Sequence, residues 1–282
     1  MKKLILIVLV VGIAGVAGVV RSHTKGNAWP VVINSDKQSG AGVREEIRKN
    51  YDLAPGARVE VSGINGWVKI ETSNTRTADV YIERNAASQE SLNRRKITIE
   101  STVNGLTIRG EKSDNGFLSG IFGSNPTEHV TLRLPRQIAL VAQGVNGAVN
   151  VGEIDGAVAI HGVNGKVEVA QATGAAEFNG INGNVAVGIS QLDKAVDIHG
   201  INGNIELRLS ESVNADLDAH GMNGSVSSDL ANVVIDKNHH GSYSAHIGNG
   251  GNSINASGIN GNIRLTRMLT AGASGSESRS GT

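Results

Sequence analysis

A short phrase returns four times between residues 143 and 207 and constrains the fold more than any other feature of the chain. Each copy reads as a polar residue, glycine, an aliphatic residue, Asn-Gly and then alternating aliphatics. The copies begin at Gly144, Gly162, Gly180 and Gly200, so their starts differ by 18, 18 and 20 in the numbering. A period of this length, kept this closely, is typical of folds that stack one structural unit on the next.

The phrase predicts one coil of a stacked β-structure. Asn-Gly favours a turn, and we expect positive φ at both of its residues. A second turn recurs with the same spacing, at Asp155-Gly156, at Thr173-Gly174 and near Asp193. One period is therefore two strands and two turns, with each residue about 4.8 Å from its equivalent in the next coil. The aliphatics expected to point inward are Val149, Val151, Val167, Val169, Val185, Val187, Ile205 and Leu207.

The repeat continues past the regular region. Gly221 and Gly258 open further copies, and His240-Gly241 lies between them, which predicts a degenerate coil in sequence order. The predicted structural turn residues are Gly144, Asn146, Gly147, Gly162, Asn164, Gly165, Gly180, Asn182, Gly183, Gly200, Asn202, Gly203, Gly221, Asn223, Gly224, Gly258, Asn260 and Gly261.

Segments outside the repeat define the domain organisation. Residues 1–21 carry Lys2, Lys3 and then an unbroken apolar run from Leu4 to Val20, which indicates a signal peptide or an N-terminal membrane anchor and export across the inner membrane. Residues 22–42 read as a flexible linker, 43–270 as the β-domain and 271–282 as a disordered tail. An insertion loop at 111–128 holds Phe117 and Phe122, and we expect it to cover the stack or to bind a partner.

Composition excludes several classes of protein. The chain has 37 glycines and only 3% aromatic residues, which suits many tight turns rather than an ordinary globular core. Its net charge is zero with both signs interspersed, so nothing indicates a nucleic-acid partner. The absence of cysteine excludes disulfides, Cys-ligated metals and a lipid-modified cysteine.

The repeat resembles that of the bacterial putative-adhesin families, including the head GIN domain. The resemblance covers residues 44–267 and rests on GVNGAVNV, GVNGKVEV, GINGNVAV, GINGNIEL, GINGNIRL and the stretch HVTLRLPRQIALVAQGVNG. It implies an all-β, single-domain, right-handed parallel β-solenoid or β-helix on the cell envelope. The N-terminal hydrophobic segment would precede this solenoid as a helix.

Two columns of residues stand out as candidate sites. His199, His220 and His240 share one position in three copies of the repeat. If the coils stack their imidazoles on one another, the three side chains could bind a transition metal together or become protonated together near pH 6.5. An exposed polar column without a ligand explains them better. The asparagines of Asn-Gly should bond one another from coil to coil, as in other stacked sheets.

We expect no catalytic residue and no cofactor, because the chain lacks the glycine-rich phosphate motifs, the nucleophile elbow and the zinc-protease motif. The favoured function is a non-enzymatic, exported envelope protein that binds an envelope or surface component, protein or polysaccharide. The expected location of the exported protein is the periplasm, the membrane or the cell surface. One alternative is a self-assembling, bactofilin-like scaffold that associates end to end. A β-helix enzyme acting on polysaccharide is a weaker alternative.

Overall fold

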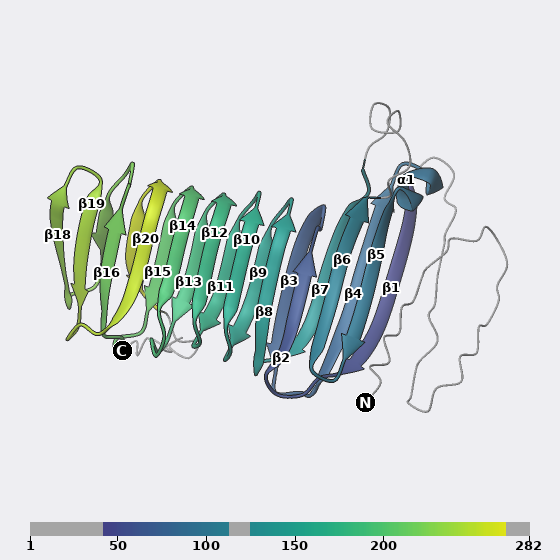
Figure 1. Ribbon diagram of the computed structural model, residues 1–282, viewed down its shortest axis with the longest axis horizontal. Helices are drawn as coiled ribbons and strands as arrows, with labels where there is room; N and C mark the ends of the chain where they lie inside the picture. Colours follow the sequence, from purple (N-terminus) through teal and green to yellow (C-terminus); the bar gives the residue numbers. More distant parts are fainter. Residues whose placement is uncertain (1–41, 113–124, 269–282) are drawn as a thin grey trace, which may run out of the picture.

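A computed structural model describes residues 42–112 and 125–268 of the chain. The described residues form two large, mostly parallel β-sheets that lie face to face (Figure 1). Sheet A has the strand order β1-β4-β7-β3-β9-β11-β13-β15-β21-β17, and sheet B has the order β18-β19-β16-β20-β14-β12-β10-β8-β2-β6-β5. The predicted all-β class is confirmed, whereas the right-handed β-solenoid or β-helix and the N-terminal helix stay predictions.

The helix of the described part is α1 (Gln89–Asn93), capped by the Ser88 side chain. No helix within residues 42–112 and 125–268 is long and apolar enough to cross a bilayer. The predicted leader at 1–21, the linker up to residue 41, the tail at 271–282 and loop residues 113–124, with Phe117 and Phe122, lie outside the described residues.

The middle of the molecule stacks in sequence order. Each coil is one strand of sheet B, a Gly-x-Asn-Gly corner and one strand of sheet A. Val167 pairs with Val185, and Val185 pairs with Ile205, which are the steps of 18 and 20 that the repeat predicts. The coils are β8–β9 (Ile138–Val145, Val149–Ile154), β10–β11 (Val158–Val163, Val167–Ala172), β12–β13 (Ala176–Asn182, Val185–Ile189) and β14–β15 (Val196–Asn202, Ile205–Leu209).

The C-terminal end of the stack is interleaved, which corrects the predicted order. The last coil, β20–β21 (Asn252–Asn260, Ile263–Arg267), lies directly on β14–β15, and the earlier coil β16–β17 (Ala215–His220, Val226–Ser228) lies outside it. Strands β18 (Val233–His239) and β19 (Ser242–Ile247) form an antiparallel hairpin on sheet B. The predicted coil at His240 is wrong, because that segment has no Asn-Gly corner to carry the chain into sheet A.

The N-terminal end is interleaved in the same way. Coil β2–β3 (Ala57–Ser62, Gly66–Ser73) lies between β8–β9 and the later coil β6–β7 (Gly105–Lys112, Thr127–Pro135). Antiparallel strands finish both sheets at this end (Figure 1). They are β1 (Val43–Asp52) and β4 (Thr77–Ala86) on sheet A, and β5 (Arg95–Thr102) on sheet B.

One continuous core fills the space between the sheets. All eight aliphatics predicted to point inward, from Val149 to Leu207, are at most 4% exposed. Phe178 of β12 is also fully buried in this layer. Alternation along each strand therefore leaves every second side chain on an outer face, where any ligand must bind.

The two glycines of each corner are required for different reasons. Gly162 has φ +61°, and a Cβ there would still be 3.7 Å from the nearest atom, the Gly144 nitrogen. A Cβ at Gly165 would lie only 2.4 Å from the Gly147 carbonyl oxygen in the preceding coil. No non-glycine residue in the described part has positive φ, so the expectation for the asparagines was wrong.

The asparagines of the corners form the predicted ladder. Each Nδ2 donates to the Oδ1 of the next asparagine towards the N-terminal end, over 2.9 to 3.0 Å. In spatial order the ladder is Asn65, Asn146, Asn164, Asn182, Asn202, Asn260 and Asn223. The interleaved coil is part of it, so its corner asparagine occupies the same position as those of the other coils in the ladder.

A buried ion pair anchors the N-terminal end. Glu128 is completely buried, and Arg95 Nε donates to its Oε1 over 3.0 Å. The backbone N–H of Asn65 donates to Glu128 Oε2 over 3.0 Å, and Arg95 also donates to the Gly63 carbonyl. These hydrogen bonds compensate for the buried charge and fix β5 and β7 to the first corner.

The two glycines make a testable contrast. Gly162→Ala should cost about 1–2 kcal/mol of unfolding free energy, the cost of left-handed backbone for a residue with a Cβ. Gly165→Ala should cost about 3 kcal/mol or more, because the new methyl group meets backbone that cannot move aside. Denaturant unfolding of the full chain measures both.

Gly162→Asn is the control, since asparagine tolerates left-handed φ better than alanine and should lose less stability. If Gly165→Ala proved as stable as Gly162→Ala, close coil stacking at this corner would be refuted.

Candidate functional site

The outer face of sheet A carries a row of polar side chains directly after the corners. Strand register aligns the row with one residue per coil, and all its members are exposed. In spatial order they are Lys166, Asn184, Asn204, Asn262 and Ser225.

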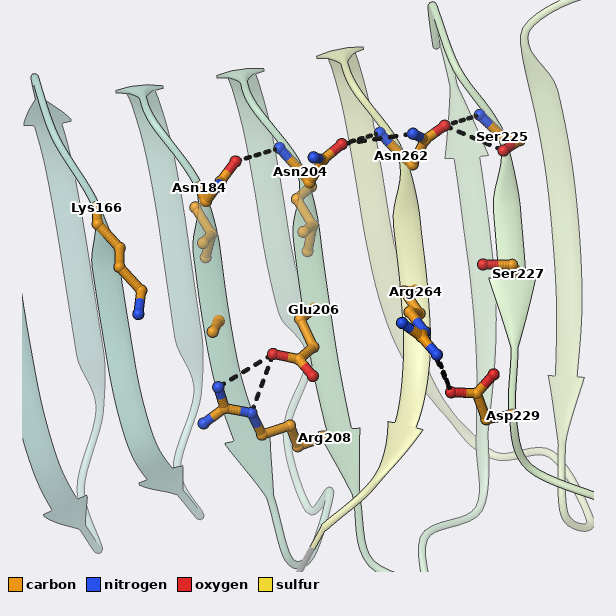
Figure 2. A pocket seen from close by; sticks show the side chains of 13 residues that line it. Lys166, Asn184, Asn204, Glu206, Arg208, Ser225, Ser227, Asp229, Asn262 and Arg264 are labelled. Carbon is orange, nitrogen blue, oxygen red and sulfur yellow. Dashed lines mark hydrogen bonds and ion pairs between the residues drawn. The ribbon is translucent and has the colours of Figure 1, made fainter.

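Backbone contacts hold this row in place (Figure 2). Asn184 Oδ1 accepts the backbone N–H of Asn204 over 2.9 Å, and Asn204 Oδ1 accepts that of Asn262 over 3.0 Å. Asn262 Oδ1 accepts both the N–H and the hydroxyl of Ser225 over 3.0 Å. Each amide is therefore oriented by the next coil before any ligand arrives.

Ion pairs lie beside the row. Arg208 bridges two carboxylates, Glu206 at 3.0 Å and Glu168 at 3.2 Å, and Lys166 reaches Glu168 at 2.7 Å. Arg208 crosses the intervening strand β13 where its outward residues, Ala186 and Gly188, are small.

The next coils carry a second ion pair. Arg264 Nη2 lies 2.6 Å from Asp229 Oδ2, and its Nε donates to the same oxygen over 3.1 Å. Together with the Arg208 network, three cations face three carboxylates. The surface is therefore charged locally but balanced overall.

These contacts set the ionisation of the network. The hydrogen bond from Lys166 lowers the pKa of Glu168, partial burial raises it by less, and Arg208 lowers it further. Partial burial lowers the pKa of Arg208, but the hydrogen bonds to Glu206 and Glu168 outweigh it and raise that pKa. Glu168 therefore stays ionised at neutral pH, which is unsuitable for a general acid.

The row and the ion-pair residues other than Glu168 line an open groove of about 690 Å³ across β13, β15, β21 and β17 (Figure 2). The lining has no His, Cys or Tyr, and its apolar members are Val185, Ala186 and Ile205. The chemistry available is hydrogen bonding to polar groups from a fixed, nearly flat surface.

The histidine column is interrupted, and the expectation that successive coils stack His199 on His220 was wrong. Ser257 of the interleaved coil pairs with both, and it hydrogen-bonds His199 Nδ1 over 2.7 Å. His220 Nδ1 is 3.0 Å from Asp218 Oδ1, and His240 lies in the turn between β18 and β19. No group of three His, Asp or Glu in the described ranges could hold a metal ion.

The sequence did contain a signal for the polar row. The phrase GINGN places a second asparagine directly after Asn-Gly at Asn184, Asn204 and Asn262. Sequence reasoning considered only the first asparagine of each phrase, which lies in the corner and serves the ladder.

Comparison with known proteins gives structural relatives only. No protein-family model matches the chain, and no curated protein sequence is significantly similar to it.

Three solved structures align along most of their length. A putative cell adhesion protein from Clostridium sporogenes is 12% identical with TM-score 0.35, over 79% of this chain and 99% of that one. A putative adhesin from Parabacteroides distasonis is 14% identical with TM-score 0.32, over 78% and 96%. A putative lipid binding protein from the same species is 10% identical with TM-score 0.28, over 82% and 98%. The adhesin descriptions match the family that the repeat resembles, and likeness at this level assigns no ligand to this chain.

Acid should weaken the groove network through Glu168. Because its folded pKa is depressed, its stabilising contribution is complete above the unfolded pKa of about 4.3 and is lost as pH falls through the folded value. The melting temperature of the native chain should therefore fall towards that of Glu168→Gln as pH drops from about 5 to 3.

In a chain that also carries Arg208→Gln, the melting-temperature difference between Glu168 and Glu168→Gln should be smaller above about pH 5, where Glu168 is ionised, because one of its two cationic partners is gone. A constant difference across this pH range would contradict the role given to Glu168.

Proposed function

We propose that this chain is a non-enzymatic, exported cell-envelope protein that binds an envelope or surface component through the outer face of sheet A. The carrying observation is the groove, where amides, hydroxyls and paired charges from successive coils are fixed in one surface. The right-handed β-solenoid and the cleaved or anchoring N-terminal segment are part of this proposal. Relatives described as adhesins agree with a binding role in general terms.

The groove favours a polar ligand. One relative is described as lipid binding, but the groove has a mainly polar lining and no enclosed apolar cavity for an acyl chain. The lining has no His or Cys that could activate Ser225 or Ser227 as a nucleophile, which favours binding over catalysis.

The terminal strands of the stack disfavour the alternative of a scaffold that assembles end to end. A filament needs open strand edges, but the outermost strand of sheet B, β18, carries exposed Asp236, Lys237 and His239. Charged residues on an edge strand disfavour pairing with another chain. At the other end, antiparallel β1 and β5 replace the parallel coils. We therefore favour binding over assembly.

Two measurements test the proposal. Fractionation of the native protein with sequencing of its N-terminus should place it outside the cytoplasm. The purified full chain should bind isolated cell envelopes in a sedimentation assay, and the double variant Arg208→Ala, Arg264→Ala should bind about 10-fold less tightly, since arginines at interfaces often dominate binding.

The matched control is Arg58→Ala, Arg109→Ala, which removes two exposed arginines from sheet B. Equal loss in both double variants, or a purely cytoplasmic protein, would overturn the proposal.

A further inference from the structure

Flat aromatic groups lie on the same face as the groove, towards the N-terminal end. Trp67 of β3 pairs directly with His129 of β7, and their rings stack with centroids 4.8 Å apart and planes inclined by 18°. Both side chains are partly exposed, because the next residues, Val68 and Val130, point into the core. Stacking with His129 holds the indole in one orientation on the surface.

A third ring extends this patch. Tyr81 of β4 lies on the strand beside β7, opposite Thr131, and is partly exposed. The Arg48 guanidinium from β1 lies over the Tyr81 ring, 4.7 Å from its centroid. Neighbouring strands thus present planar groups side by side, which we call the aromatic patch (Trp67, His129, Tyr81).

Trp67 and His129 of the aromatic patch belong to the same row of the sheet as the groove asparagines. The pairs Val68 with Val149, Val149 with Val167 and Val167 with Val185 place Trp67 in register with Ala148, Lys166 and Asn184. Small Ala148 separates the two parts. From β7 to β17 the row crosses seven strand spacings, or about 34 Å at about 4.8 Å each.

This row fits a carbohydrate chain better than other polymers. Sugar rings present C–H faces that stack on aromatic rings, and hydroxyls that bond amides, serine and carboxylates. Because the row presents one outward side chain per strand, an extended chain laid across the strands passes an aromatic ring, a cation and then successive amides. Peptide binding by strand addition is excluded here, since it needs a sheet edge rather than a face.

The paired charges of the groove indicate that the bound carbohydrate is neutral. Each groove cation already has a carboxylate partner: Lys166 lies 2.7 Å from Glu168, Arg208 lies 3.0 Å from Glu206, and Arg264 lies 2.6 Å from Asp229. A polyanion needs cations that are not already neutralised. The pairs instead offer neutral hydroxyls both donors and acceptors.

We propose that the outer face of sheet A binds an extended, neutral, β-linked polysaccharide, with Trp67 stacked on one sugar unit and the Asn184–Asn204–Asn262 row bonding the hydroxyls of others. This inference rests on the proposed binding function and names its ligand class.

Trp67 provides the readout. The chain has two tryptophans, so a full-length Trp29→Phe protein leaves Trp67 as the sole indole. Titration with cellohexaose, chitohexaose and laminarihexaose should give a saturable change in its fluorescence with at least one of them. Heparin and polygalacturonate should bind less tightly than that oligosaccharide.

Variants of the native chain locate the site by calorimetry. Trp67→Ala should weaken binding about 10-fold or more, as for a central aromatic anchor. Asn204→Ala should weaken it about 3-fold, the value of one hydrogen bond. The matched control Asn179→Ala, on the outer face of sheet B, should change it less than about 2-fold. If Trp67→Ala fails to fold, His129→Ala tests the same stack.

Three results would overturn this inference: no neutral oligosaccharide binds, binding survives both Trp67→Ala and His129→Ala, or a polyanion binds more tightly. Competition on isolated envelopes separates the two proposals. If a saturating concentration of the bound oligosaccharide fails to displace arginine-dependent envelope binding, the polysaccharide fails while the binding function stands. If intact envelopes are not bound, the proposed function itself fails.

Discussion

Close contact between backbones of successive coils is the constraint on which the rest of this structure depends. At the corner, the space that a Cβ of Gly165 would need is occupied by the Gly147 carbonyl, so neighbouring coils meet in a single register. That register aligns the inward aliphatics in one core and the corner asparagines in one ladder. It also aligns the outward residues, which creates a continuous surface from groups that are far apart in sequence.

Interleaving at both ends extends this surface. Because β20–β21 enters between β14–β15 and β16–β17, Asn262 lies between Asn204 and Ser225 and continues the polar row. At the other end, insertion of β2–β3 between later coils brings Trp67 against His129. The contacts that complete the candidate binding face therefore join residues far apart in sequence, by 58 and 37 positions across the groove. Such non-local pairing favours slow folding, with the ordered middle as the natural starting point.

The sequence was sufficient for most of what the repeat implies within one coil, although not for the backbone φ of the corner asparagines. The spacing of the coils, the inward valines and the asparagine ladder all follow from one phrase and strand alternation. It was not sufficient for the order of the terminal coils, because the phrases at Gly221 and Gly258 are nearly equivalent and only their packing decides which lies inside. The predicted stacking of His199 on His220 was wrong for this reason, because the interleaved coil places Ser257 between them.

Other features had no periodic signal at all. Glu128 ends a stretch that reads as a polar loop, yet it is completely buried by its pairing with Arg95, 33 positions away. The Arg208 bridge to Glu168 depends on small residues in the strand between them, which only the register reveals. The ion pairs therefore had to be taken from the structure, whereas the asparagine row could have been found from the GINGN phrase.

Cysteine cross-linking tests the interleaved order most directly, since the native chain has no cysteine to interfere. His199 and Ser257 pair across adjacent strands, whereas His199 and His220 are separated by one further strand, about 10 Å in all. We predict that His199→Cys, Ser257→Cys forms a disulfide under mild oxidation and that His199→Cys, His220→Cys does not. The opposite result would show that the coils stack in sequence order and would remove the continuous face on which the account rests.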